Sequence, residues 1–327
     1  MINELPKLLE RDFILAFYLP AVLFVIAVYF ALGPLLPLPP EILAASAGKS
    51  EDAVSLATVG ALVAVLIAFV LMVANISLIR ILEGYPPWLR NLPWFGDRQA
   101  DRFAFVRGRL GYLEENWDEV AAGGAVALER AREERNRLLR ESVERFPDDE
   151  DLLLPTALGN VLRAFECYPR VMYGLDSIAG WPRLIAVIPE AFGKSVGSAK
   201  AGVDFWINTA YLSALVVPAL VVRLLHDHAG ALAAPWSGLP AAAAAEMLLA
   251  LAALLLAALC YRLAVTAAID WGHTVKAAFD LYLPDLARQL GYEPPLSRDV
   301  WERISKSFVY WYELPPRRPP DPPDWAG

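Results

Sequence analysis

The polar residues inside long apolar stretches are the ones best placed to do chemistry in this sequence. Asn75 and Ser77 stand near one end of such a stretch, and Asn208 and Thr209 stand inside another. At membrane depth, a polar side chain either hydrogen-bonds a neighbouring helix or lines an aqueous path. We therefore single out these four residues as pore-lining or interhelical candidates, with both alternatives open.

A catalytic site cannot be assembled around these positions. No aspartate or histidine lies deep enough in the apolar stretches to activate Ser77 or Ser213 as a nucleophile. The chain also lacks a nucleophile elbow, a phosphate-binding glycine loop, a dinucleotide glycine pattern and an HExxH helix. We expect no catalytic residue, and a protein that is not an enzyme.

Metal binding is the chemistry suggested by two short segments, and each has a simpler interpretation. His226 and His228 are two residues apart, so on a helix they point to different faces and do not share a metal. The acidic run 148–151 lacks the interleaved ligands and the turn glycine of a calcium loop. We expect no metal and no cofactor.

Four apolar stretches set the architecture that positions these residues. The chain of 327 residues is 57% hydrophobic, whereas soluble domains average about 45–50%. The excess is concentrated in residues 13–33, 57–79, 205–222 and 243–261. Because a helix of about 20 apolar residues crosses the hydrocarbon core, we predict an all-α membrane protein with four transmembrane helices.

The distribution of basic residues predicts the orientation of these spans. The connections 37–53 and 227–242 carry one basic residue between them, Lys49, whereas Arg80, Arg90, Lys194 and Lys200 flank the opposite span ends. By the positive-inside rule, the N-terminus, the C-terminus and the middle segment are cytoplasmic. We expect a multi-pass protein of a bacterial cytoplasmic (inner) membrane. The net charge of −8 is not that of a nucleic-acid-binding protein.

These observations divide the chain into five regions. The middle and C-terminal regions have the helical periodicity of ordinary globular sequence. We predict an N-terminal interfacial helix and transmembrane helices 1 and 2 in residues 1–83, a cytoplasmic helical domain in 84–202, transmembrane helices 3 and 4 in 203–270, cytoplasmic C-terminal helices in 271–313, and a proline-rich tail in 314–327.

Local signals predict several details of these helices. Pro20 predicts a kink in the first span, and Thr156 is a suitable N-cap for an amphipathic helix. Residues 181–189 are apolar but too short to span, so they are either buried in the middle domain or in contact with the membrane. Glu141 and Arg145 are spaced for an ion pair along one helix.

The C-terminal region carries two further signals. Asp299 and Glu302 have the spacing of a capping box that opens a last helix, and four large apolar residues share one face of it: Trp301, Ile304, Phe308 and Trp311. Before it, the residues around Phe279 and Leu286 predict one short helix, separate from the fourth span.

Three longer phrases resemble a recurrent family. They are LIRILEGY at 78–85, LPTALGNVLRAFECYPRVMYGLDS at 154–177 followed by WPRL at 181–184, and VKAAFDLYLPDLARQLGYEPP at 275–295. In this order they resemble a group of uncharacterised bacterial four-span membrane proteins. The resemblance implies one shared architecture, but no activity and no site residues. Pro284 in the last phrase predicts a helix that is not straight.

Two functional interpretations follow. The one that demands least of the sequence is a non-enzymatic membrane scaffold or sensor whose cytoplasmic helical domain binds a protein partner. The alternative is a homo-oligomeric channel or membrane-perturbing effector, because the alanine-rich fourth span permits close helix packing. We expect the lipid bilayer and further copies of the chain as partners, together with a cytoplasmic protein, and no nucleic acid.

Overall fold

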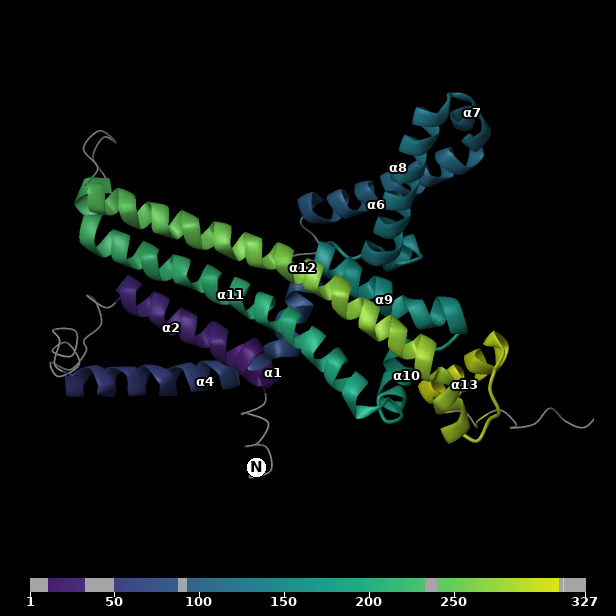
Figure 1. The fold of residues 1–327 in the computed structure, drawn as a ribbon. Coiled ribbons are helices and arrows are strands. Elements are labelled where there is room, and N and C mark those ends of the chain that lie inside the picture. The colour runs from purple at the N-terminus through teal and green to yellow at the C-terminus, as the bar shows by residue number, and fades with distance from the viewer. Residues whose placement is uncertain (1–10, 33–49, 88–92, 233–239, 312–313, 315–327) are drawn as a thin grey trace, which may run out of the picture. The chain divides into compact units, whose positions relative to one another are not determined.

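The structure is a computed structural model that describes residues 11–32, 50–87, 93–232, 240–311 and 314 (Figure 1). All regular elements within these residues are helical, as predicted. The expected interfacial helix at the N-terminus and the proline-rich tail fall almost entirely outside the described residues.

Among the described residues, four helices are long and apolar enough to cross a membrane. The candidate spans are Arg11–Leu32, Ala57–Glu83, Glu190–His228 and Ala241–Gln289. Even the shortest, with 22 residues, is about 33 Å long at 1.5 Å per residue. The four predicted spans are therefore confirmed as membrane-length helices.

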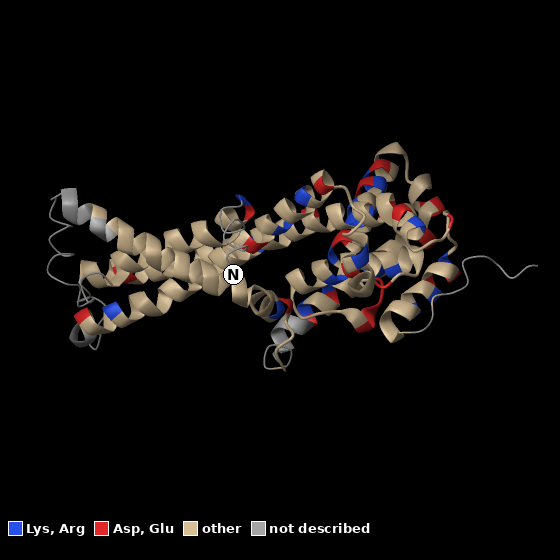
Figure 2. Cartoon of the chain, turned by 90° about the horizontal axis from the view of Figure 1, so that it is seen from below, with Lys and Arg blue, Asp and Glu red and all other residues tan. Residues whose placement is uncertain are grey.

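The chain forms two compact units. Unit 1 comprises residues 1–79 and 200–267, and unit 2 comprises residues 80–199 and 268–327. The middle and C-terminal regions, which we predicted as separate regions, thus belong to one unit. Figure 2 shows that charged residues are sparse along the helices of unit 1 and frequent on those of unit 2.

Unit 1 is built from the apolar parts of the span helices. The elements that contribute to it are α1 (Arg11–Phe13), a π-helical turn (Ile14–Tyr18), α2 (Leu19–Leu32), α4 (Ser50–Glu83), α11 (Glu190–Leu232) and α12 (Ala241–Gln289). Small residues fit α4 against α2, with Ala21, Ala64 and Ala68 at the centre of the contact. Side chains without bulk let the two backbones approach closely.

Unit 2 is an assembly of amphipathic helices. It contains α6 (Pro93–Glu115), α7 (Trp117–Ala122), α8 (Ala125–Arg145), a 3-10 turn (Glu150–Leu152), α9 (Ala157–Tyr173), α10 (Ser177–Leu184) and α13 (Arg298–Tyr310), with parts of α4, α11 and α12. One face of α9 is buried almost throughout, and α9 contacts α8, α10 and α13. It is therefore the central helix of the unit.

Several local predictions are confirmed. Thr156 caps α9 by accepting a hydrogen bond from the Gly159 N–H at 3.0 Å. Gly174 ends the same helix in the left-handed conformation, which glycine adopts without strain. A π-helical turn, Ile14–Tyr18, ends two residues before Pro20, and the kink at Pro20 stays a prediction. Residues 181–189 are partly buried, since Leu184 and Ile188 are buried whereas Ile185 is exposed, and contact of the exposed side with the membrane stays a prediction.

Other predictions at this scale are wrong. The separate short helix around Phe279 is the continuation of the fourth span, because α12 runs unbroken to Gln289 through Pro284. The expected capping box does not form, since α13 begins after Ser297 without a side-chain cap. Trp311 leaves the shared apolar face because the helix ends at Tyr310 and Trp311 turns into the left-handed conformation.

Candidate functional site

Asn208 lies in the interior of unit 1, where it completes the backbone hydrogen bonding of the first span. In a regular helix the carbonyl of Ala16 would accept from residue 20, but Pro20 has no N–H to donate. The Asn208 side-chain Nδ2 donates to the Ala16 carbonyl instead, at 2.8 Å. Asn208 is fully buried. A polar side chain of one span thus repairs the defect that a proline leaves in another.

The other predicted candidates lie in different surroundings. Thr209 donates to the Phe205 carbonyl of its own helix at 2.7 Å. Asn75 is buried, and its Oδ1 has no hydrogen-bond partner among the described residues. Ser77 is exposed on the surface of α4. Because these positions point to different sides of their helices, the structure does not bring the four residues together in one site.

Tyr211 makes a second interhelical hydrogen bond in unit 1. Its hydroxyl donates to the Leu78 carbonyl of α4 at 2.9 Å. Asp204, Asn208 and Tyr211 follow one another at intervals of four and three residues, so they share one face of α11. From this face Asn208 contacts the first span and Tyr211 contacts the second.

Arg223 makes the polar contacts near the other end of unit 1, and the sequence analysis did not single it out. Its Nη1 donates to the carbonyls of Phe30 and Ala31, at 3.1 and 3.2 Å, where α2 ends. Its Nε lies 2.9 Å from Oε1 of Glu246 on α12, although the N–H does not point at that oxygen. A guanidinium thereby neutralises a buried carboxylate and satisfies carbonyls that the end of a helix leaves free.

In unit 2 the end of α4 is joined to the start of α9. The Thr156 hydroxyl donates to the Leu82 carbonyl at 2.6 Å. Gly84 has a φ of +92°, and a Cβ at this position would overlap the ring of Pro155. Residues of two phrases singled out in the sequence, 78–85 and 154–177, therefore meet at this junction.

Asn160 is the buried polar centre of the junction. Its Oδ1 accepts from the Leu154 N–H at 2.7 Å, and its Nδ2 donates to the Leu154 carbonyl at 2.8 Å and to Gln99 Oε1 at 3.2 Å. Asn160 is fully buried. These bonds fix the turn before α9 and tie it to α6.

An ionisable cluster lies beside the junction. Arg163 Nη2 donates to the Tyr85 hydroxyl at 2.5 Å, and Arg163 Nη1 lies 3.4 Å from Glu166 Oε2. Burial raises the pKa of the Glu166 carboxyl, and the nearby Arg163 only partly opposes this. Burial likewise raises the pKa of Tyr85. The Glu166 carboxylate of this cluster is therefore protonated more readily than an ordinary glutamate.

The third phrase, 275–295, contacts α9 through Asp280. Its Oδ1 accepts from the hydroxyls of Tyr168 and Tyr173, at 2.7 and 2.6 Å. Burial, with the hydrogen bond to Asp280, raises the pKa of Tyr168 to about 12 and also raises that of Tyr173. Both hydroxyls are therefore donors at neutral pH, and they fasten α12 to α9.

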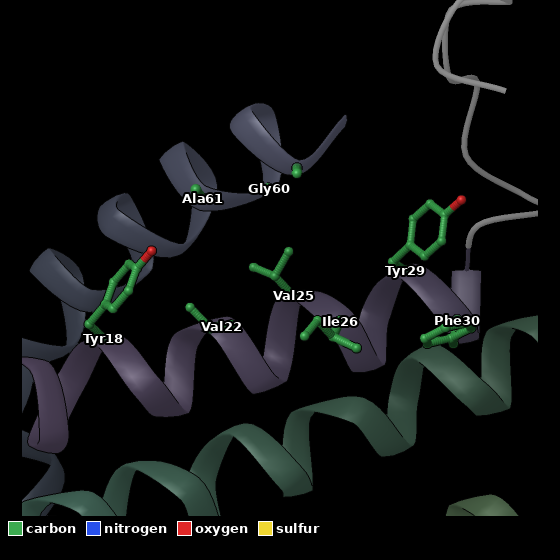
Figure 3. A pocket seen from close by; sticks show the side chains of 9 residues that line it. Tyr18, Val22, Val25, Ile26, Tyr29, Phe30, Gly60 and Ala61 are labelled. Carbon is green, nitrogen blue, oxygen red and sulfur yellow. The ribbon is translucent and has the colours of Figure 1, made fainter. Parts of the chain in front are cut away.

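Two apolar grooves run between the helices of unit 1. One, of about 370 Å³, lies between α2 and α4 and is lined by Tyr18, Tyr29 and small residues of α4 that include Gly60 and Ala61 (Figure 3). The other, of about 250 Å³, is lined by residues of α2, α11 and α12, among them Thr209. Their largely apolar walls suit hydrocarbon chains or a packed helix, and the polar groups in their linings are hydroxyls.

The described residues contain no group of three His, Cys, Asp or Glu side chains placed to hold a metal ion. His226 is paired with its neighbour Asp227, the His226 Nδ1 to Asp227 Oδ1 distance being 2.8 Å. No protein-family model matches the chain, and neither a curated protein nor a solved structure matches it. Function must therefore be argued from the geometry alone.

Proposed function

We propose that the protein is a non-enzymatic scaffold or sensor of a bacterial cytoplasmic membrane, whose unit 2 lies in the cytoplasm and binds a protein partner. The observation that carries this proposal is a set of exposed apolar side chains on two adjoining helices of unit 2 and on the residues that directly follow them. We name it the α10–α13 surface, and its members are Ile178, Ile185, Val309, Tyr310 and Trp311.

Contacts inside unit 2 support a continuous surface. The Asp176 N–H, at the start of α10, donates to Ser305 Oγ of α13 at 2.8 Å. Near the ends of the same helices, the guanidinium of Arg183 lies over the ring of Phe308 at 3.9 Å. The two helices therefore run together, and their exposed side chains belong to one region of the unit.

The composition of this surface favours a protein as its partner. Ile178, Tyr310 and Trp311 are 70%, 64% and 92% exposed. Exposed apolar side chains that gather in one region mark interaction sites more often than single exposed residues do. Trp, Tyr and Arg are the residue types that contribute most to binding in protein interfaces. Arg183 lies beside the exposed side chains of this surface, over the ring of Phe308.

The cytoplasmic placement of unit 2 rests on charge. The basic residues that flank the spans on its side are Arg80, Lys194 and Lys200. Lys and Arg accumulate in cytoplasmic segments near span ends, and the dense charge of unit 2 suits an aqueous compartment (Figure 2). The same reasoning places both ends of the chain in the cytoplasm.

Photocrosslinking in living cells tests the proposal. A photoreactive phenylalanine analogue would replace Trp311 or Ile178, and Val126 on α8, which is 66% exposed, is the matched control. We expect a discrete protein adduct from both test positions and none from Val126. The same adduct should disappear when Ile185→Glu is added. Crosslinks to lipid alone, or equal adducts from Val126, would contradict partner binding at this surface.

The alternative is a homo-oligomeric channel or membrane-perturbing effector. Only 17–28% of the apolar window of each span is buried within the chain, and the groove in Figure 3 has small residues on which a second helix can pack. Native mass spectrometry in lipid nanodiscs separates the two functions. A closed ring of four or more copies would favour the channel, whereas a monomer or dimer has no central axis for conduction.

A further inference from the structure

We propose that Asp204 and Asn208 form a binding site for a monovalent cation of the Na⁺ type, with the ammonium of Lys200 as a built-in competitor. The proposal concerns the interior of unit 1, and its success or failure is independent of partner binding by unit 2. It rests on two buried oxygen atoms that accept no hydrogen bond within the described part of the chain.

The first observation is the burial of these oxygens. Asp204 is 4% exposed and Asn208 is 0% exposed. Asp204 Oδ1 and Asn208 Oδ1 both have no hydrogen-bond partner among the described residues. A buried polar oxygen without a partner is destabilising, and here two such oxygens belong to residues one helical turn apart on the same face of α11.

The second observation fixes the direction of the Asn208 amide. The Ala16 carbonyl can only accept, so the side-chain nitrogen must face it, and Oδ1 is the other atom of the amide. The free atom is therefore an acceptor. Two hard oxygens, one of them from a carboxylate, therefore call for a cation or another donor.

The charge of the site selects a monovalent ion. One carboxylate is present, and Lys200 Nζ lies 2.6 Å from Asp204 Oδ2. Calcium sites use several carboxylates and six to eight oxygens, and the described residues hold no cluster of that kind. The Lys200 side chain is 38% exposed, so its ammonium can move toward solvent when a second cation approaches Asp204.

The test is the dependence of thermal stability on Na⁺, measured on the full chain in lipid nanodiscs. NaCl would be exchanged for N-methyl-D-glucamine chloride at constant ionic strength, so that screening stays fixed. A ligand that binds only the folded state raises the unfolding midpoint in a saturable manner. We expect such a rise for the native chain, and none for Asp204→Asn, which keeps the shape and removes the charge.

Lys200→Gln should strengthen Na⁺ binding, because it removes the lysine that competes with the ion for Asp204. Removing one neighbouring charge should lower the half-saturating Na⁺ concentration by about tenfold. Thr209→Val, at a residue that bonds only its own helix, should leave the response unchanged. The inference is overturned if neither the native chain nor Lys200→Gln shows a saturable Na⁺ effect, or if Asp204→Asn retains the full effect. In either case water would be the donor to these oxygens.

Discussion

At the scale of single residues, the contact between Pro20 and Asn208 makes a testable prediction. Asn208→Leu leaves the Ala16 carbonyl buried without a donor, and should lower the free energy of unfolding by about 1 kcal/mol, the usual size for an interhelical hydrogen bond in a membrane. In the Pro20→Ala background the backbone N–H of residue 20 can serve that carbonyl. The same Asn208→Leu change should then cost much less.

A double-mutant cycle of unfolding in detergent micelles measures this difference. It isolates the coupling between the two positions, because each single variant removes one member of the pair. Thr209→Val serves as the control and should give the same cost in both backgrounds. Equal costs of Asn208→Leu in both backgrounds would show that Asn208 does not compensate for the proline.

The sequence identified Asn208 as a residue of interest, but it could not identify what Asn208 binds. The acceptor, Ala16, has no polar side chain, and its carbonyl becomes available only because Pro20 follows four residues later. Arg223 is a second residue whose hydrogen-bond partners the sequence could not identify. Its acceptors are the backbone carbonyls at the end of α2, which no side-chain pattern marks.

At the scale of helices, the approach of α9 to the end of α4 depends on Gly159. A Cβ at this position would lie 2.5 Å from the Glu83 carbonyl oxygen, so Gly159→Ala should destabilise unit 2 by about 1–3 kcal/mol through overpacking. Gly193 is the matched control, since nothing lies within 4 Å of its added Cβ. Gly193→Ala should stabilise the helix by about 0.5–1 kcal/mol.

Thermal unfolding and amide hydrogen exchange of α9 would measure the two variants. We expect faster exchange in α9 for Gly159→Ala only. If both glycines respond alike, the close contact between α4 and α9 is not what requires glycine at position 159.

Two carboxylates of unit 2 should show opposite dependence on pH. A hydrogen bond from Arg102 lowers the pKa of Glu141 in the folded state, so its contribution is present above the unfolded value near 4.5 and is lost as pH falls through the folded value. Burial raises the pKa of Glu166, so the stability linked to its proton is present at low pH and is lost as pH rises.

The expected results follow from these signs. Glu141→Gln should destabilise the protein at neutral pH, and the loss should shrink in acid. Glu166→Gln should stabilise it at neutral pH, and the gain should vanish near pH 4.5, the ordinary glutamate value. Unfolding midpoints of both variants across this range measure the effect. The same sign for both variants at neutral pH would contradict the assignment.

Helix periodicity predicted the type of almost every element but not the partners of their charges. Glu141 was expected to pair with Arg145 along α8. It forms a bidentate salt bridge with Arg102 of α6 instead, with both N–O distances at 2.7 Å. A planar guanidinium that matches a carboxylate across two helices is favoured over a flexible pair on one exposed face. Sequence spacing cannot reveal this pair, because the two residues are 39 positions apart.

At the scale of the whole molecule, the two compact units do not follow the limits of the helices. Apolar composition locates the spans, but the helices do not end where the apolar residues end. Helices α4, α11 and α12 each contribute residues to both units. Composition therefore changes within a continuous helix, where no turn marks the boundary.

The orientation of the molecule is open to a direct test by cysteine labelling. The native thiols Cys167 and Cys260 are both buried, so background reaction with a membrane-impermeant maleimide should be low. His226, whose side chain is 68% exposed, lies near one end of the third span, and Val126 lies in unit 2. Because basic residues flank the spans on the side of unit 2, His226→Cys should react in intact spheroplasts. Val126→Cys should react only after lysis. The reverse pattern would place unit 2 outside the cell and would remove the basis for a cytoplasmic partner.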